Sequence, residues 1–193
     1  MNTQISPQAY ATLVCWFLFS MTWLWQRNRT KENINPRTTA QKISGFLGFV
    51  IIFLALYSPL FFTGGMAKVI IPQSHVVQTI GLICCIAGVF ISIWSRFLLG
   101  MNWSGGITAK KDHKLIVSGP YRFVRHPIYT GFITALTGTC LVMGGIAGIL
   151  VTGLYTIGLL TKINKEEVLL TELFGEVYTE YRQRTRKLIP FIW

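Results

Sequence analysis

The sequence predicts an all-α integral membrane protein with five transmembrane helices, the last two forming a hairpin, followed by a cytoplasmic C-terminal amphipathic helix. The 193 residues are 51% hydrophobic and 13% charged, with a mean hydropathy of +0.48, which is too apolar for a soluble domain of this length. Long intervals contain no charged residue, and a charge at the centre of a bilayer costs about 3 kcal/mol. The 18 basic residues gather between these intervals, so the net charge of +11 does not indicate a nucleic-acid-binding protein.

The charge-free intervals define the membrane spans. They cover 1–26, 43–67, 69–95 and 126–161. A straight helix over the last interval would be about 54 Å long, nearly twice the hydrocarbon core of about 30 Å. We therefore divide it at Gly144 and Gly145, where a tight turn is expected to join two short spans. The predicted spans of a single domain, 1–193, are then about 8–26, 43–63, 76–97, 127–143 and 146–162.

The first span is expected to remain in the membrane. It has no Lys or Arg before Arg27 and so lacks the basic leader of a cleaved signal peptide. Four cysteines lie in apolar stretches without the spacing of a zinc or redox motif: Cys15, Cys84, Cys85 and Cys140. We interpret them as packing residues and predict no metal site.

The distribution of basic residues predicts the orientation of the chain. With five spans, 17 of the 18 Lys and Arg residues fall on one side, in the loops 27–42 and 96–125 and in the tail from Lys162 onward, and only Lys68 lies opposite. Because basic loops stay in the cytoplasm, we expect the N-terminus outside and the C-terminus in the cytoplasm. All acidic residues fall on the same side, so the chemistry is expected there.

The tail from Lys165 onward is predicted to form an amphipathic helix. One face carries apolar residues at helical spacing, namely Leu170, Leu173, Phe174, Val177 and Tyr181. Another face carries Glu172, Glu176 and Glu180. Such a helix would lie against the membrane edge or against the protein's own loop.

The segment 113–131, HKLIVSGPYRFVRHPIYTG, combines polar and aromatic groups just before the fourth span. Gly119 and Pro120 favour a turn, and Arg125 and His126 precede Pro127, which suits the first turn of a helix. Tyr121 and Tyr129 offer ring faces. Composition alone favours an interfacial belt in which Tyr, Arg and His anchor a span.

A second polar patch, 162–167, lies at the end of the fifth span, and the hairpin brings it beside the first. Glu166 and Glu167 could form a polar pocket with Arg125 and His126. Alternatively, they could favour the start of the tail helix, where negative charge meets the positive end of the helix dipole.

These motifs resemble the isoprenylcysteine carboxyl methyltransferase family and its relatives among the phospholipid methyltransferases. The resemblance rests on GPYRFVRHPIYTG at 119–131, preceded by LGMNWS at 99–104 and followed by EEVLLTELFGEVYTEY at 166–181 and RKLIP at 186–190. It implies a membrane methyltransferase, with catalytic motifs 99–131 and 162–190, that uses S-adenosylmethionine without a Rossmann domain. The sequence contains no GxGxxG motif, which agrees with this implication.

The resemblance also implies the site residues. The cofactor contacts fall on His113, Lys114, Leu115, Ile116, Tyr121, His126, Pro127, Ile128, Tyr129 and Glu166. Tyrosine rings suit the cofactor's sulfonium through cation–π attraction. The implied catalytic residues are Arg125, His126 and Lys162, and Lys162 stands where the family has an arginine on the substrate side. Lysine keeps the charge but not the planar fork that binds a carboxylate with two hydrogen bonds.

The acceptor is expected to be lipidic or small and apolar and to enter from the bilayer. A prenylcysteine-like carboxylate is the first choice, and a phospholipid amine or a small thiol is the alternative. Two other functions stay open: a membrane reductase of the sterol-reductase type, which would bind a nicotinamide cofactor, and a non-enzymatic membrane protein. Gly144 and Gly148 form a GxxxG pattern that is expected to pack helices within the bundle, although dimerisation stays open.

Overall fold

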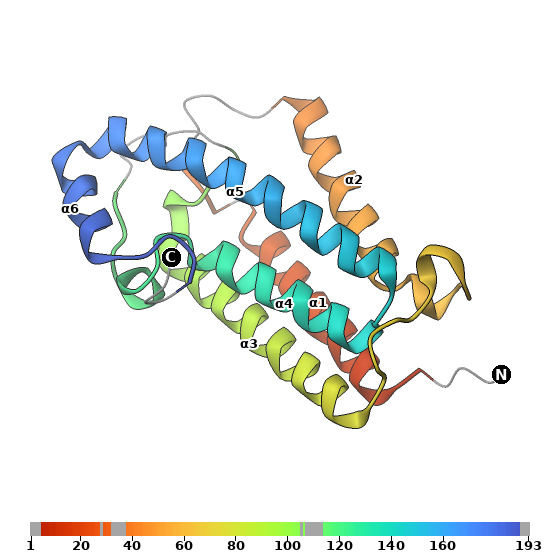
Figure 1. The fold of residues 1–193 in the computed structure, drawn as a ribbon. Helices are drawn as coiled ribbons and strands as arrows, with labels where there is room; N and C mark the ends of the chain where they lie inside the picture. The colour runs from red at the N-terminus through yellow and green to blue at the C-terminus, as the bar shows by residue number, and fades with distance from the viewer. Residues whose placement is uncertain (1–4, 28, 32–37, 105, 107–113, 190–193) are drawn as a thin grey trace.

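The computed structural model describes residues 5–27, 29–31, 38–104, 106 and 114–189. These residues form an all-helical bundle without strands. The helices are α1 (Pro7–Trp25), α2 (Thr39–Leu56), α3 (His75–Leu99), α4 (Pro127–Met143), α5 (Ile146–Phe174) and α6 (Glu176–Arg184). Figure 1 shows α6 and the start of α4 at one end of the bundle and the turn between α4 and α5 at the other. We call the first of these the α6 end.

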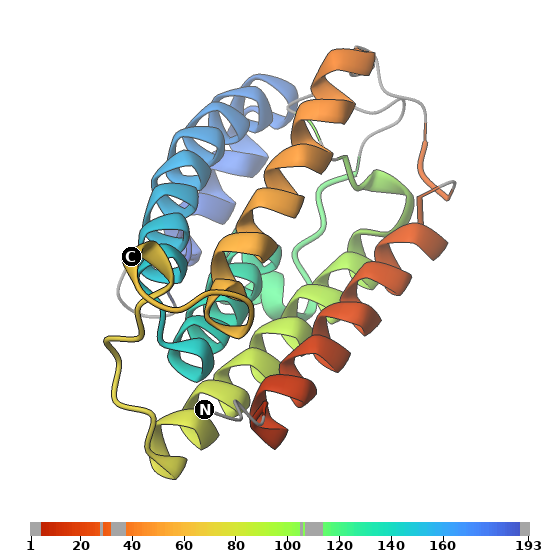
Figure 2. The same ribbon diagram turned by 90° about the vertical axis from the view of Figure 1, so that its right-hand side faces the viewer.

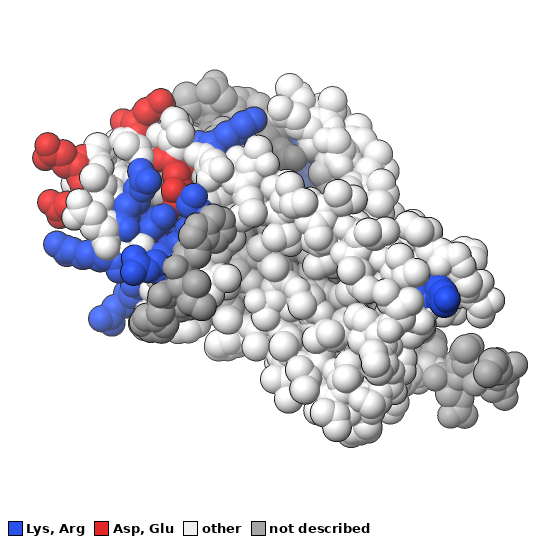
Figure 3. Space-filling view, in the orientation of Figure 1, with Lys and Arg blue, Asp and Glu red and all other residues white. Residues whose placement is uncertain are grey.

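Three helices within the described residues are long and apolar enough to cross a membrane: Thr39–Leu56, His75–Asn102 and Ile146–Phe174. The apolar helix Pro127–Met143 is shorter. Large apolar side chains cover the outside of the bundle, among them Phe17 of α1, Phe46 of α2 and Leu154 of α5. Figure 3 shows most of the charged side chains gathered at the α6 end, while most of the remaining surface in this view is uncharged. This surface suits a lipid environment.

The close packing of α3 against α4 depends on glycine. A Cβ atom at Gly88 would lie 2.4 Å from the backbone of Gly131 and Ala135, and one at Gly81 would lie 2.7 Å from the carbonyl of Gly138. The glycines are seven residues apart on each helix, so they fall on one face and let the two backbones meet. Figure 2 shows α3 and α4 side by side. This close pair holds in place the loop that follows α3 and the residues that precede α4, and both lie at the α6 end.

Helices α1, α2 and α4 meet in an aromatic cluster centred on Trp16 of α1. Its ring contacts Phe19, Phe53 and Phe132 edge-on or at steep angles, with centroids 5.1 to 5.4 Å apart. Its indole Nε1 donates to Thr139 Oγ1 of α4 over 2.9 Å. Lipid chains offer the indole N–H no acceptor, so the Thr139 hydroxyl serves it within the bundle. This hydrogen bond ties α1 to α4.

The turn at Gly144 and Gly145 lies where the sequence places it. Gly144 caps α4 in the left-handed region, with φ of 70°, and Gly145 caps the start of α5. Gly144 is buried in this turn against Val69 and Gln73, whereas Gly148 packs between helices, where a Cβ would touch Leu56 of α2 and Cys140 of α4.

Two helices have other ends than the membrane spans predicted within them. The second span was expected over 43–63, but α2 begins at Thr39, where Thr38 and Gln41 form a capping box, and ends at Leu56 before a turn containing Pro59. The fifth span was expected to end at 162, but α5 continues to Phe174 and breaks only at Gly175, whose φ is 55°. The predicted tail helix is therefore the second half of α5 together with α6.

Candidate active site

A cavity opens at the α6 end, between the loop after α3, the start of α4, the second half of α5, and α6. It is lined by Leu99, Asn102, Trp103, Ser104, Gly106, Lys114, Leu115, Ile116, Tyr121, Arg125, His126, Ile128, Tyr129, Glu166, Leu169, Leu170, Tyr178 and Tyr181. Apolar and aromatic side chains predominate, and a few polar groups converge among them, as in most small-molecule sites.

Most of the site residues predicted from sequence line this cavity. Those that do are Lys114, Leu115, Ile116, Tyr121, Arg125, His126, Ile128, Tyr129 and Glu166. Pro127 is buried beneath them as the first residue of α4, where its missing N–H is not needed. Lys162 lies one helical turn before Glu166 and contacts it beside the cavity. His113 lies outside the described residues.

Glu166 connects α5 to the start of α4. Its Oε1 accepts a hydrogen bond of 2.8 Å from the hydroxyl of Tyr129 and lies 3.6 Å from Lys162 Nζ. Lys162 Nζ also lies 5.0 Å from the centre of the Tyr129 ring, within cation–π distance. The His126 and Tyr129 rings stack at 5.8 Å, and His126 Nδ1 lies 3.8 Å from Glu166 Oε2. The carboxylate thus has a cation and two ring systems around it.

Glu167 faces a different set of partners. Its Oε1 accepts a 2.7 Å hydrogen bond from Arg125 Nε, and its Oε2 lies 3.9 Å from Lys187 Nζ. The same guanidinium donates to the carbonyls of Thr185 (2.7 Å) and Arg182 (3.3 Å), at the end of α6. A cation there also meets the negative end of the helix dipole. The Arg125–Glu167 pair therefore joins α4, α5 and α6.

The position of both glutamates corrects one interpretation of the sequence. Glu166 and Glu167 were offered as charges at the start of a tail helix, but they lie inside the continuous helix α5, well after its first turn. No helix N-terminus is present there to be stabilised. The polar pocket with Arg125 and His126 is the arrangement that the structure contains.

The segment 185–189 holds the start of α4 in place. The backbone N–H groups of Arg125 and His126 donate to the carbonyls of Arg186 (2.8 Å) and Lys187 (3.2 Å), and Thr130 Oγ1 donates to Leu188 (2.7 Å). The two N–H groups precede α4 and have no acceptor within it, whereas Thr130 Oγ1 also donates to the carbonyl of His126 over 3.2 Å. The C-terminal segment supplies the acceptors and so fixes the direction of the His126 side chain.

The sequence analysis missed two tyrosines of α6 that line the cavity, Tyr178 and Tyr181. Tyr181 donates to the carbonyl of Tyr121 over 2.7 Å. Burial raises the pKa of Tyr121 and Tyr178 well above the ordinary phenol value, so both hydroxyls stay protonated and can only share neutral hydrogen bonds. The signal for them was their three-residue spacing, which places both on the inner face of α6.

Arg96 was grouped with the loop cations, but the structure places it in the last turn of α3 with 1% of its surface exposed. Its guanidinium donates to the carbonyls of Gly100 (2.9 Å) and Gln26 (3.3 Å) and lies 4.2 Å from the centre of the Trp103 ring. Trp103 lines the cavity. Arg96 therefore shapes the cavity wall and ties it to the end of α1.

Comparison with known proteins shows which families have similar sequences. Residues 80–172 match the sequence model of the isoprenylcysteine carboxyl methyltransferase (ICMT) family. The protein-S-isoprenylcysteine O-methyltransferase of Schizosaccharomyces pombe is 30% identical over 118 residues, which cover 60% of this chain and 49% of the relative. The methanethiol S-methyltransferase 1 of Bradyrhizobium diazoefficiens is 42% identical over 71 residues, covering 37% of this chain and 24% of the relative.

The fold is also similar to a solved structure, that of the eukaryotic intramembrane Ras methyltransferase, isoprenylcysteine carboxyl methyltransferase. The TM-score is 0.52 at 25% sequence identity, over 82% of this chain and 55% of the other. This chain spans about half the length of these isoprenylcysteine methyltransferases. The matches confirm the resemblance and relate this integral membrane protein to the isoprenylcysteine carboxyl methyltransferase family.

Proposed function

We propose that this protein is a membrane-embedded methyltransferase that uses S-adenosylmethionine and methylates the carboxylate of a prenylcysteine-like lipid acceptor. One observation supports this most strongly. The two motif segments that carry the family resemblance, 99–131 and 162–190, are far apart in sequence yet line one cavity. This convergence is what a shared site for donor and acceptor requires.

The residues of the cavity fit the proposed cofactor. One buried polar atom on its wall, Tyr178 Oη, has no hydrogen-bond partner among the described residues, and His126 Nε2 has only Glu167 Oε1 at 3.5 Å nearby. Buried polar groups rarely go without a partner, so a polar ligand is expected to serve them. Glu166 suits an ammonium or a ribose hydroxyl, and Tyr121 and Tyr129 offer electron-rich rings to a sulfonium. When bound, S-adenosylmethionine supplies a methyl group that a nucleophile takes by direct displacement.

The protein's part in this reaction is to hold the acceptor and exclude water. A carboxylate is already ionised at neutral pH, so its methylation needs no general base. Lys162, close to Glu166 and the Tyr129 ring, can attract the acceptor's negative charge. The apolar wall of Leu99, Leu169 and Leu170 excludes water and so strengthens that attraction.

The acceptor is proposed to enter from the bilayer, because the cavity lies at one end of an otherwise apolar bundle. The first half of α2 is exposed along its whole circumference, from Thr39 to Leu47. A lipid chain could therefore lie against this helix while its head reaches the cavity. We also propose that the chain spans the membrane five times with its N-terminus outside, so that the α6 end is cytoplasmic.

A second candidate is methylation of a small thiol. The identity of 42% with a methanethiol S-methyltransferase favours it, as does Lys162, which lacks the forked geometry for a carboxylate. The two acceptors differ in pH dependence. A thiol must lose a proton before it attacks, so its methylation should accelerate as the pH rises towards about 8.5, whereas a carboxylate should react at a nearly constant rate over this range.

Calorimetry with the purified protein tests the cofactor. S-adenosylmethionine should bind, and Glu166→Ala and Tyr129→Ala should each weaken binding by about 1–3 kcal/mol, the range of a hydrogen bond to a charge or a desolvated cation–π contact. Glu172→Ala, at an exposed position on the same helix, is the matched control. Binding of a nicotinamide cofactor instead would support the reductase, and unchanged affinity in both folded variants would contradict the proposed site.

A further inference from the structure

Two short segments at the α6 end form an exposed ridge of alternating basic and apolar side chains. Segments 122–124 and 186–189 lie side by side, joined by a 3.1 Å hydrogen bond from the N–H of Arg186 to the carbonyl of Phe123 and by a parallel bridge between Val124 and Arg186. The exposed side chains are Arg122, Phe123, Arg186 and Ile189, which we call the interfacial ridge.

The apolar side chains of the ridge are exposed, although other apolar side chains of the same two segments are buried. Val124 and Leu188 are only 4% and 5% exposed, whereas Phe123 and Ile189 are 54% and 49% exposed. Two large apolar side chains exposed to water are unfavourable, at about 25 cal/mol for each Å² that a bilayer would otherwise cover. Their exposure favours contact with lipid.

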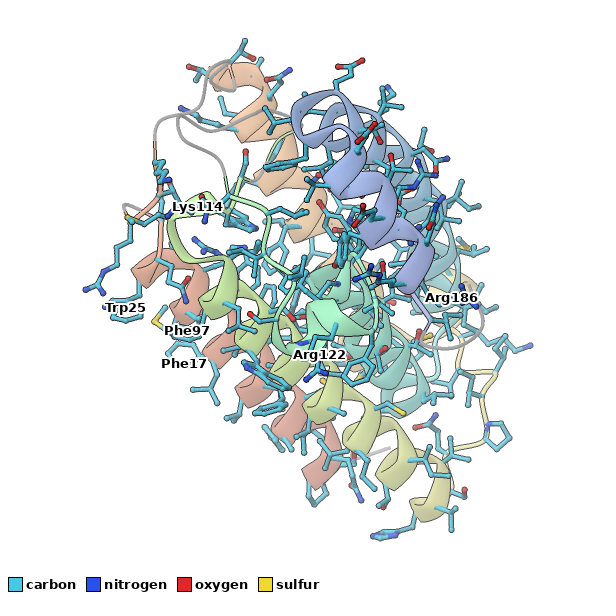
Figure 4. All side chains as sticks on the ribbon, turned by 90° about the vertical axis from the view of Figure 1, so that its left-hand side faces the viewer. Phe17, Trp25, Phe97, Lys114, Arg122 and Arg186 are labelled. Atoms are coloured by element: carbon cyan, nitrogen blue, oxygen red, sulfur yellow. The ribbon has the colours of Figure 1, made fainter. Side chains whose placement is uncertain are left out.

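The basic members have no ion-pair partner within the described part of the chain. Arg125, on the same segment, is paired with the buried Glu167, but Arg122 and Arg186 make no such contact there. Figure 4 shows Arg122 near the centre of this face and Arg186 to its right, with Trp25 and Phe97 on the left flank. Arginine binds phosphate oxygens through its planar fork of donors.

The ridge lies at the height where a membrane surface is expected. Phe123 precedes the first residue of α4 by four positions, and a Cβ at Gly119 would touch Trp94 and Leu98 near the end of α3. Trp94 is itself half exposed, and tryptophans gather where hydrocarbon meets the head groups.

We infer that the interfacial ridge binds an anionic phospholipid. Its phosphate would be held by Arg122 and Arg186, and its acyl chains would pack on Phe123 and Ile189. Basic and apolar groups together are the combination that gives stable attachment to an anionic membrane surface, where either alone is weak. Because Arg186 and Lys187 also supply the carbonyls that hold Arg125 and His126, a lipid bound here would steady the start of α4 beside the cavity.

Native mass spectrometry of the full chain in detergent, titrated with phosphatidylglycerol or phosphatidylcholine, tests this inference. The unmodified protein should bind phosphatidylglycerol more tightly, and Arg122→Gln with Arg186→Gln should lower that affinity about tenfold while leaving phosphatidylcholine binding unchanged. The control, Lys165→Gln with Arg184→Gln, removes the same charge from exposed positions outside the ridge and should retain the preference.

Phe123→Ser provides a variant with unchanged charge and should weaken both lipids. Equal loss in the arginine and control variants would show that only the net charge attracts lipid and would overturn the inference. Equal affinity of the unmodified protein for the two lipids would overturn it as well. Circular dichroism of each variant checks that the helices are intact.

Discussion

Glu166 and Glu167 are neighbours in sequence, but helical geometry separates their roles. Successive residues point about 100° apart on a helix, so Glu166 faces the cavity with Tyr129 and Lys162 while Glu167 faces Arg125 and Lys187. The sequence alone showed an acidic pair near a basic motif. It could not show which carboxylate faced which partner, because the rotation of α5 about its axis is set by packing against α4.

Glu167→Gln should therefore reduce stability more than cofactor binding. The change leaves the nearly buried guanidinium of Arg125 without its counter-charge, and breaking a buried ion pair costs about 3 kcal/mol. Thermal unfolding in detergent should show a clearly lower midpoint than for Glu166→Gln, whose carboxylate is more exposed. The opposite order, with Glu166→Gln the less stable variant, would contradict this division of roles.

Lys162→Met should raise the acceptor's Michaelis constant and leave cofactor affinity nearly intact. The ammonium lies beside the Tyr129 ring and Glu166, where a negatively charged acceptor is expected, and losing it removes attraction in the ground state and transition state alike. Steady-state kinetics with calorimetry of the cofactor separates the two effects. Lys165→Met is the control, and equal losses of both affinities in Lys162→Met would assign the lysine to the cofactor or the fold.

At the scale of elements, hydrophobic intervals and glycines determined most of what could be predicted. The turn at Gly144 and Gly145 was visible because an uncharged stretch too long for one crossing must reverse. The continuation of α5 to Phe174 was not, because the charged residues from Lys165 onward suggested the end of a span, although they are good helix formers. Composition marks where a helix leaves the membrane, and this need not be where the helix ends.

Gly88→Ala tests the contact between α3 and α4. A Cβ there would lie 2.4 Å from backbone atoms of α4, which cannot move aside as a flexible side chain would, so we expect a loss of about 1–3 kcal/mol of stability. Gly153→Ala on α5 is the matched control, because no atom lies within 4 Å of its added Cβ. Thermal unfolding of both variants measures the difference, and equal midpoints would show that the two helices can separate without cost.

For the whole molecule, the family resemblance predicted most residues that line the cavity, but it did not predict the contacts that give the cavity its shape. Motif residues such as Tyr121, His126 and Tyr129 were found by their order in the sequence. Arg96 was missed because its role depends on the approach of α1, which no local pattern records. The spacing of Tyr178 and Tyr181 places them on one face, but it does not show that this face packs over the cavity. Long-range packing thus completes a site of which sequence motifs show only part.

The proposed topology is testable by labelling single cysteines in a variant without the four native ones. Arg29→Cys and Arg184→Cys should react with a membrane-impermeant maleimide only from the cytoplasmic side, and Thr63→Cys only from the opposite side, because 17 of the 18 basic residues then lie in the cytoplasm. All three positions are exposed or half-exposed. Labelling of Arg184→Cys from outside would rule out five spans with this orientation.

The central claim is methyl transfer to a lipid carboxylate, and label transfer measures it directly. The protein in bilayer nanodiscs would be given S-adenosylmethionine labelled in the methyl group together with a farnesylated cysteine that has a free carboxylate, or with a small thiol. A methyl ester releases its label as methanol in base, whereas a thioether retains it. We predict label in the lipid fraction that base releases and that Tyr129→Ala greatly reduces. Label found only in a base-stable thioether, or transfer to neither acceptor, would contradict the claim.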